Sequence, residues 1–158
     1  MNFTDADKKW MNLAMKEAQK AFQQDEVPIG AIIVKDNKII SSAHNQKEQN
    51  KIATHHAEIL AINEACKKLD SWRLSGCILY STLEPCLMCA GAIHQARIAK
   101  VVFSCFDPKA GGLGSIYNFS TDKRLNHRHK CYQGLLAEES KSILQNFFRN
   151  KRKKKPLL

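Results

Sequence analysis

The spacing of apolar and polar side chains divides the chain into alternating helices and strands. Apolar residues recur every three or four positions in the predicted helices and form short runs in the predicted strands. Thr4 and Asp7 form an N-cap pair before the first helix, and Pro85 occupies a first helical position, where proline is favoured. In chain order the pattern predicts a helix at residues 5–22, a hairpin at 27–34 and 39–42, a polar loop at 44–54, a helix at 57–68, a strand at 77–81, a helix at 85–96, a strand at 100–104, a glycine-bearing loop at 107–115 and a last helix from about 137.

This order predicts an α/β fold with a mixed sheet covered by helices. Strands joined through a helix normally run parallel, whereas the strands of a hairpin pair antiparallel. The chain has 158 residues, enough for one domain with a full hydrophobic core and too few for two ordinary ones. We assign residues 1–149 to that domain and residues 150–158 to a basic C-terminal tail.

The composition and charge of the chain limit the classes of protein to which it can belong. No apolar run approaches the roughly 18 residues of a membrane span, and the N-terminal segment lacks the pattern of a secretory signal. Neither a membrane location nor export is expected, so the six cysteines should be reduced thiols. The formal net charge is +10, and six of the 25 Lys and Arg residues lie in the last ten positions. Such a tail fits a polyanionic partner such as nucleic acid, and equally a solvated extension.

Two short patterns carry the candidate chemistry. His56 and Glu58 stand at the start of one predicted helix, and Cys86 and Cys89 at the start of another. Two thiols three residues apart lie on the same side of a helical turn, and a helix N-terminus favours thiolates. With His56 they form a set of three zinc ligands that leaves a fourth position open, as in catalytic zinc sites. Glu58 is then a carboxylate that is not a ligand, placed beside the metal-bound water and suited to general acid/base catalysis.

Each pattern taken alone is compatible with a different role. A Cys-x-x-Cys pair also fits a redox couple, half of a zinc knuckle or two core thiols, and a His-x-Glu at a helix start fits a surface position or a cap. A redox role gives Glu58 no purpose, and a closed zinc knuckle needs a second cysteine pair. The remaining cysteines show no such spacing and are expected to be small buried side chains: Cys66, Cys77, Cys105 and Cys131.

The combined pattern resembles the signature of the zinc-dependent nucleobase deaminases. Further segments are similar to the bacterial tRNA adenosine deaminases (the TadA family), in order and spacing: residues 27–31, 44–45, 54–59, 79–91, 97–98, 101–103, 107–111, 125–128 and 147–149. The resemblance implies a cytidine-deaminase-like fold. This is a three-layer α/β/α arrangement with a five-stranded mixed sheet and helices on both faces.

The resemblance also implies an activity, the hydrolytic deamination of adenosine to inosine at the wobble position of a tRNA anticodon. One zinc ion per subunit is expected on His56, Cys86 and Cys89, where it activates water while Glu58 carries the proton. No organic cofactor is expected. The implied partner is the tRNA anticodon stem-loop, the implied location is cytoplasmic, and the implied assembly is a homodimer whose RNA-binding surface draws on both subunits.

For RNA the resemblance indicates five residues. Asn45 matches the side chain that hydrogen-bonds the flipped base, although an asparagine after a hairpin is also a common turn residue. Asp107, Lys109, Asn126 and His127 fall in loops that match the anticodon-binding surface of the family. Asp107 is expected to accept a hydrogen bond from a 2′-hydroxyl and so to distinguish RNA from DNA.

Some positions depart from the family pattern. His55 replaces a small residue before His56, and Phe106 lies in a stretch that more often carries glycine and smaller or charged residues. The register with Glu58 favours His56 as the ligand and leaves His55 as a cap or an RNA contact. Phe106 is expected either to stack on a base or to pack. Two other functions stay open: a zinc-dependent deaminase of a free base or nucleoside such as guanine or cytosine, and an RNA-binding module with a structural zinc.

Overall fold

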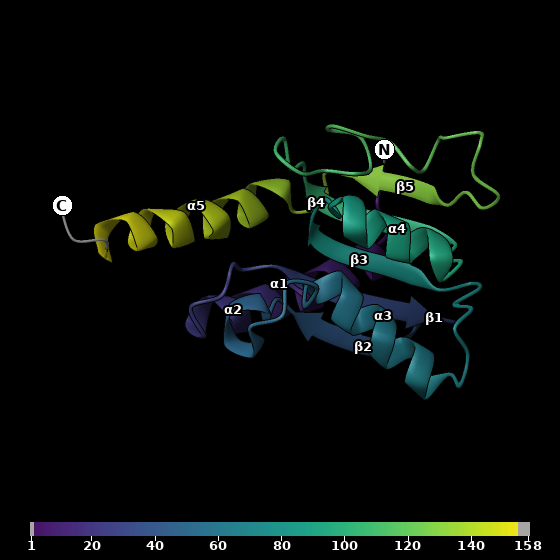
Figure 1. The fold of residues 1–158 in the computed structure, drawn as a ribbon, viewed down its shortest axis with the longest axis horizontal. Coiled ribbons are helices and arrows are strands. Elements are labelled where there is room, and N and C mark those ends of the chain that lie inside the picture. The colour runs from purple at the N-terminus through teal and green to yellow at the C-terminus, as the bar shows by residue number, and fades with distance from the viewer. Residues whose placement is uncertain (1, 155–158) are drawn as a thin grey trace.

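Five strands form one sheet with helices on both sides in residues 2–154, the part of the chain that the computed structural model describes (Figure 1). The elements are α1 (Asp5–Gln23), β1 (Gly30–Lys35), β2 (Lys38–His44), α2 (Lys47–Asn50), α3 (Ala57–Lys68), β3 (Ile78–Leu83), α4 (Leu87–Gln95), β4 (Lys100–Cys105), β5 (Lys130–Gln133) and α5 (Ala137–Lys154). The predicted hairpin, the predicted strands and the four long helices are confirmed, with ends that differ by a few residues.

The sheet is mixed, in the order β2-β1-β3-β4-β5. β1 pairs antiparallel with β2 and β3, whereas β3 with β4 and β4 with β5 pair in parallel. β2 and β3 therefore run in the same direction, as expected for strands joined through a helix, but β1 lies between them. The strand β5 falls in a stretch that the apolar pattern leaves irregular. It has only four residues, and none of them is fully buried.

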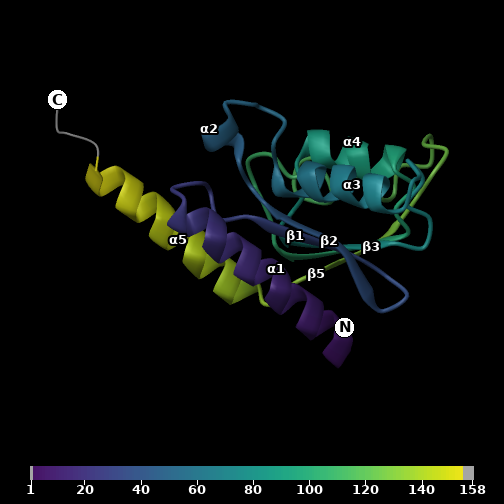
Figure 2. The same ribbon diagram turned by 90° about the horizontal axis from the view of Figure 1, so that it is seen from below.

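Helices α1 and α5 cover one face of the sheet, and α3 and α4 cover the other (Figure 2). Alternate strand residues point to opposite layers. Ile32 and Tyr80 therefore belong to the core beneath α1, whereas Ile33 and Leu79 belong to the core beneath α3 and α4. Gly30 is required at the start of β1, because a Cβ at this position would overlap the backbone of α1.

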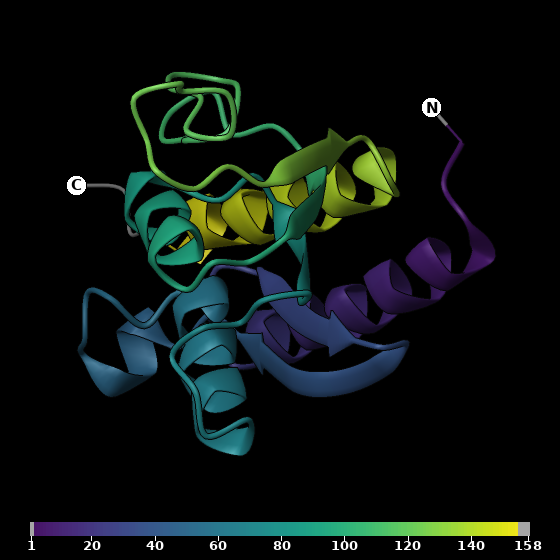
Figure 3. The same cartoon turned by 90° about the vertical axis from the view of Figure 1, so that its right-hand side faces the viewer.

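The parallel strands β3 and β4 end at one edge of the sheet, and helices α3 and α4 begin there. In Figure 1 this edge is on the side from which α5 extends. The long connection between β4 and β5 passes over the α4 side of the molecule, as the green segments at the top of Figure 3 show. Such an edge, formed by the carboxyl ends of strands, is where open α/β sheets commonly bind ligands.

The predicted position of Pro85 is wrong by two residues. Cys86 is the N-cap of α4, with φ −70° and ψ 176°, so the helix begins at Leu87 and Pro85 precedes the cap. Cys86 has an extended backbone and forms an isolated β-bridge with Gly111 in the loop that follows β4. This partner is distant in sequence, so the local pattern could not place the helix start correctly.

Two further segments differ in detail from the expected elements. The predicted loop at 44–54 contains one helical turn, α2, which begins without a side-chain cap. Helix α5 continues without interruption across the position between residues 149 and 150 to Lys154. The end of the predicted tail, residues 155–158, lies outside the described residues. Within residues 2–154 no helix has the length and apolar character needed to cross a membrane.

Asp7 joins α1 to the sheet. It completes a capping box with Thr4, in which each residue's backbone N–H donates to the other's side chain at 3.0 Å. Its Oδ1 also accepts from the Tyr80 hydroxyl at 2.7 Å and from Lys100 Nζ at 3.2 Å. Burial acts to raise the pKa of Asp7, but the hydrogen bonds from Thr4, Tyr80 and Lys100 outweigh it and lower the pKa to about 2.

Replacing Asp7→Ala should lower the free energy of unfolding by about 2–4 kcal/mol, because the helix cap and two buried bonds to a carboxylate are lost together. Urea denaturation at neutral pH measures the change. Asp5→Ala is the matched control, since the Asp5 side chain is fully exposed and makes only a 3.7 Å ion pair with Lys8. An equal loss in both variants would contradict this role of Asp7.

The lowered pKa of Asp7 also predicts a pH dependence. The carboxylate stabilises the native state above the unfolded pKa of about 4, and this contribution is lost as the pH falls toward about 2. The stability difference between the wild type and Asp7→Ala should therefore shrink across that range.

Candidate active site

His56 and Cys86 occupy equivalent positions at the starts of two neighbouring helices. Each is an N-cap residue with extended backbone, His56 for α3 and Cys86 for α4, and neither side chain caps its own helix. Cys89 lies in the first turn of α4 and is buried. The Nδ1 atom of His56 is 3.6 Å from the Sγ atom of Cys86 and 3.6 Å from that of Cys89. The two helix starts therefore bring three side chains into one cluster.

These three side chains could hold a metal ion, since their candidate ligand atoms lie within 4.8 Å of one another. In a tetrahedral zinc site, a Zn–N bond of about 2.0 Å and a Zn–S bond of about 2.3 Å place nitrogen and sulfur about 3.6 Å apart. The separations in the structure match this value. Two thiolates with an imidazole are also donors that suit zinc. The residues present therefore fit zinc, and three protein ligands leave its fourth position for water or substrate.

The electrostatics of the cluster favour a thiolate. Hydrogen bonding lowers the pKa of Cys86 to about 4, mainly through Cys89 and also through His56. The same contact with Cys86 raises the pKa of Cys89 and that of His56. The positive ends of the α3 and α4 dipoles lie at the cluster and add to the stabilisation of negative charge. Binding of a divalent cation is then expected to release the proton of the second thiol.

Glu58 is the buried carboxyl group of the site. It lies in the first turn of α3 and is only 3% exposed. Its Oε1 accepts from the Ser81 hydroxyl at 3.4 Å, and within residues 2–154 its Oε2 has no hydrogen-bond partner. Burial raises the pKa of Glu58, and the negative charge of Cys86 raises it further. A carboxyl group with a raised pKa and one unpaired oxygen is suited to exchange protons with a bound water or substrate.

Asn45 is buried, and a carboxylate that the sequence analysis missed holds it in place. Its Nδ2 atom is 3.3 Å from Glu26 Oε2 and 3.4 Å from the carbonyl oxygen of Val27, both of which are acceptors. The Oδ1 atom has no partner within residues 2–154. Glu26 itself is fully buried and accepts from the backbone N–H of Gln49 at 2.5 Å. From sequence it is one more acidic residue before a strand, with no spacing that marks it.

Asp107 and Lys109 lie on the loop after β4. Asp107 Oδ1 accepts from the backbone N–H of Lys109 at 3.0 Å, so part of the carboxylate is used within the loop. The loop is held from beneath by Glu84, a second buried acid that the sequence analysis missed. Lys109 borders a groove of about 770 Å³ whose other wall is α5, lined by Leu144, Gln145, Phe148, Arg149, Lys151 and Arg152.

Comparison with known proteins identifies the family. The family model of the MafB19-like deaminases matches residues 5–152. The tRNA-specific adenosine deaminase of Bacillus subtilis is 50% identical over 149 residues, which cover 94% of this chain and 92% of that protein. The protein of the same name from Aquifex aeolicus is 48% identical, with 90% of this chain and 94% of that protein covered. The chain belongs to the tRNA-specific adenosine deaminase family.

Solved structures agree with this membership. A chain from a study of A-to-I editing by tRNA deaminases at the wobble position superposes with a TM-score of 0.83 at 43% identity, over 86% of this chain and 99% of that one. The guanine deaminase of Nitrosomonas europaea superposes with a TM-score of 0.74 at 21% identity, over 89% and 83%, which shows a shared fold alone. The expected cytidine-deaminase-like α/β/α fold with a five-stranded mixed sheet is therefore confirmed.

The structure does not bring every residue expected from the family resemblance to one place. Asn126 Oδ1 accepts from Arg97 Nη1 at 2.9 Å, and His127 Nε2 donates to the carbonyl oxygen of Ile98 at 2.8 Å. Both contacts lie just beyond the C-terminal end of α4, whereas Cys86 lies at its N-terminal end. Nine helical residues, a length of about 13 Å, separate the two ends. Within one chain, Asn126 and His127 are thus remote from the His56–Cys86–Cys89 cluster.

His55 and Phe106, which depart from the family pattern, have clear positions. His55 lies outside the three-residue cluster, and its Nδ1 accepts from the Asn50 side-chain amide at 2.8 Å, which ties it to α2. Phe106 is 49% exposed and packs edge-on against Phe103, with ring centroids 5.2 Å apart. One side of Phe106 is therefore packed and the other is open.

The donor set predicts about one zinc ion per chain, held by Cys86, Cys89 and His56. Cys86→Ala should lose most of the metal, because removal of one of three protein ligands weakens binding severely. Metal content after dialysis, measured by inductively coupled plasma mass spectrometry, tests this. Cys66→Ala is the control, since Cys66 lies on α3 outside the cluster. Equal zinc content in both variants would remove Cys86 from the ligand set.

Proposed function

We propose that this protein is a zinc-dependent enzyme that hydrolytically deaminates adenosine to inosine at the wobble position of a tRNA anticodon. One observation carries the proposal: Glu58, buried and with one oxygen unpaired within residues 2–154, lies beside the cluster of His56, Cys86 and Cys89. The relatives named as tRNA-specific adenosine deaminases support the choice of substrate. A structural zinc needs no buried proton acceptor of this kind, and a dithiol redox pair needs no histidine.

In this mechanism His56 Nδ1 and the thiolates of Cys86 and Cys89 would hold one zinc ion per subunit. The metal, when bound, supplies an activated water for addition to C6 of the base. Glu58 would take a proton from this water at Oε2 and deliver it to N1 of the ring as the hydroxyl adds to C6. It would then carry the proton of that C6 hydroxyl to the exocyclic amino group, so that the C6–N bond breaks, ammonia leaves and the C6 carbonyl of inosine forms. Because burial raises its pKa, Glu58 can hold the proton between these steps.

Asn45 would orient the flipped base. Its Nδ2 faces two acceptors, Glu26 Oε2 and the Val27 carbonyl, so the orientation of the amide is determined. The Oδ1 atom then remains to accept a hydrogen bond from the amino group of adenine or from a ribose hydroxyl. A buried acceptor of this kind disfavours ligands that offer no donor.

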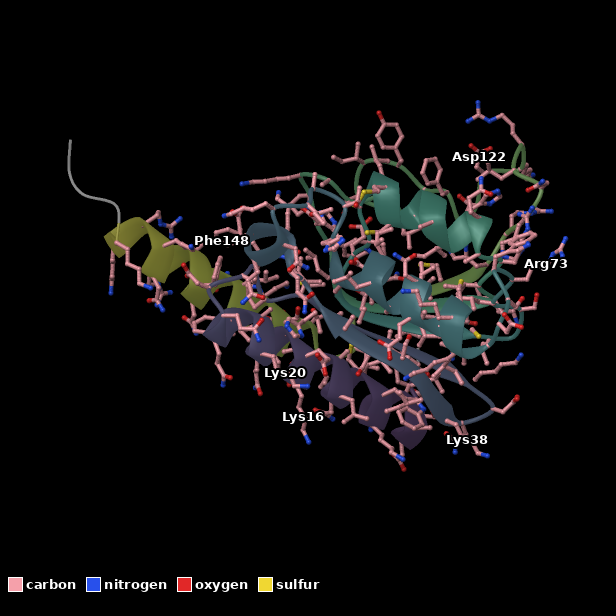
Figure 4. All side chains as sticks on the ribbon, turned by 60° about the horizontal axis from the view of Figure 1, so that its bottom comes forward. Lys16, Lys20, Lys38, Arg73, Asp122 and Phe148 are labelled. Atoms are coloured by element: carbon pink, nitrogen blue, oxygen red, sulfur yellow. The ribbon has the colours of Figure 1, made fainter. Side chains whose placement is uncertain are left out.

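The RNA would approach over α5. Phe148 is 46% exposed and lies at the end of the molecule opposite Arg73 and Asp122 (Figure 4). It lines the groove that Lys109 and Arg149 border, so an aromatic ring and cationic side chains share one surface. Unpaired bases stack on aromatic rings, and Lys and Arg neutralise phosphates. An anticodon loop offers both groups.

The remote position of Asn126 and His127 fits a homodimer. In such an assembly these residues would contact the RNA that is bound at the other subunit's zinc cluster. A tRNA substrate also places the enzyme in the cytoplasm. A heterodimer of one Cys86→Ala subunit and one His127→Ala subunit would show whether His127 serves the zinc cluster of its own chain or that of the other subunit.

Replacing Glu58→Ala should reduce inosine formation by about 10²–10⁴-fold while zinc content is unchanged, because the proton carrier is lost and the ligands are not. The assay uses a synthetic anticodon stem-loop with adenosine at the wobble position and chromatography of the released nucleosides. Free adenosine, guanine and cytosine are tested alongside.

Glu64→Ala is the matched control on the same helix, since Glu64 makes only a surface ion pair with Lys68. It should retain full activity. Ammonia release from a free base instead of the stem-loop would keep the zinc chemistry and overturn the tRNA substrate. Stem-loop binding without any product would favour a structural zinc.

The basic surface of α5 predicts a salt effect. The double variant Arg149→Ala/Arg152→Ala should bind the stem-loop more weakly and lower the slope of log Kd against log salt by about 1.5, because two phosphate contacts are lost. Fluorescence anisotropy at salt concentrations from about 50 to 300 mM measures this slope. The control is the double variant Lys16→Ala/Lys38→Ala, which also removes two positive charges but at positions far from Phe148 (Figure 4). It should leave the slope nearly unchanged.

A further inference from the structure

Glu84 is the most fully hydrogen-bonded buried acid near the metal cluster. It follows β3, is 1% exposed, and stands two residues before Cys86. Its Oε2 accepts from the backbone N–H of Asp107 at 2.9 Å, and its Oε1 accepts from those of Leu113 and Ser115 at 3.0 Å each. The Ser115 hydroxyl also donates to Oε2. All four donors belong to the loop of residues 107–115.

A carboxylate satisfies all of these donors at once. Each oxygen of Glu84 receives two donors, and within residues 2–154 no cation pairs with it. A glutamine whose NH₂ group replaced Oε2 would leave the Asp107 backbone N–H without an acceptor, although the Ser115 hydroxyl could rotate to accept from the amide; the opposite orientation would leave the N–H groups of Leu113 and Ser115 unpaired. Buried N–H groups without acceptors are costly, so the loop would rearrange.

The same loop is also attached to the metal-ligand segment. Gly112 N–H donates to the carbonyl oxygen of Pro85 at 2.9 Å, and Gly111 forms the β-bridge with Cys86. A Cβ on Gly111 would overlap the Glu84 carboxylate, so only glycine allows the loop to pass this close. The loop therefore lies directly over Glu84, Pro85 and Cys86.

The loop carries the two side chains expected to meet RNA. Asp107 begins it, and exposed Lys109 follows at the border of the groove beside α5. The Asp107 N–H donates to Glu84, while the Asp107 carboxylate turns outward enough to accept from Lys109 N–H. Glu84 thus bonds to both ends of a loop that lies between the metal cluster and the basic groove.

We propose that Glu84 is a positioning residue: it holds the RNA-binding loop, residues 107–115, at a fixed position relative to the metal ligand Cys86. This rests on the proposed function, because it takes Asp107 and Lys109 as RNA contacts. Without the Glu84 carboxylate, the protein loop of residues 107–115 detaches from Cys86. Asp107 and Lys109 then no longer hold the RNA anticodon loop at a fixed distance from the metal cluster. We call the hydrogen bonds between Glu84 and the loop of residues 107–115 the clamp. Zinc binding and the proton transfer by Glu58 do not depend on it.

Three variants test the clamp: Glu84→Gln, Glu84→Asp and Ser115→Ala. Limited trypsin digestion followed by mass spectrometry gives the rate of cleavage after Lys109, relative to cleavage after Arg124, which is exposed on the same connection in the native protein. Glu84→Gln should raise this ratio about tenfold or more. Ser115→Ala removes one donor and keeps the carboxylate, so its effect should be smaller, and it serves where Glu84→Gln fails to fold.

The functional readouts are the Kd of the anticodon stem-loop by anisotropy and the kinetics of inosine formation. Glu84→Gln should raise Kd and KM about tenfold, with a smaller fall in kcat and unchanged zinc content. Glu84→Asp keeps the charge and should recover part of the affinity. Glu138→Gln is the matched control, because the Glu138 side chain is exposed and pairs with Lys141 on the surface.

Each outcome decides the proposal. Faster cleavage after Lys109 together with weaker RNA binding supports it. Faster cleavage with unchanged Kd and KM overturns it, as does unchanged cleavage in both Glu84→Gln and Ser115→Ala. Loss of zinc or a matching loss of kcat in Glu84→Gln would assign the residue to the metal site instead. If the wild type binds the stem-loop without deaminating it, the proposed function fails while cleavage and Kd still test the clamp.

Discussion

The meeting of two helix N-termini at one edge of the sheet is the constraint on which the site depends. His56 and Cys86 can approach each other because each precedes its helix in an extended conformation and leaves its side chain free of capping. Parallel pairing of β3 with β4 brings the start of α4 and the loop after β4 to the same edge. The helix dipoles then act together on the cluster, so that negative charge on a thiolate is stabilised before any cation arrives.

Three buried glutamates surround this edge, and their hydrogen bonds give them different chemistry. Within the described residues, Glu84 has both oxygens saturated, Glu26 has one partner for each oxygen, and Glu58 has one oxygen without a partner. A carboxylate with every lone pair engaged holds the backbone in place and has little capacity to move a proton. Glu58 has the oxygen without a partner, and burial raises its pKa, which together suit it to proton transfer. Residue type alone does not separate these roles.

The sequence predicts features that depend on neighbours along the chain. The Thr4 and Asp7 pair, the hairpin and the periodic helices are all local, and the spacing of His56, Glu58, Cys86 and Cys89 suffices to suggest their cluster. The sequence cannot predict β5, because within the described residues its four residues form a strand by pairing with β4. Nor can it place Glu84, because the donors that distinguish this acid from a surface residue come from 23 and more positions away.

The basic end of the chain combines two physical effects that counting charges cannot separate. Cations in the last turn of α5 oppose the negative end of the helix dipole, which is a purely structural benefit. Arg152, which lies in this last turn, and Arg149 also line the groove shared with Lys109, so that like charges gather around one groove. Such an arrangement destabilises the free protein and is offset only when an anion enters. Because α5 is helical through Lys154, the backbone that carries these charges is ordered, and in the proposed function an RNA backbone would meet a preformed surface.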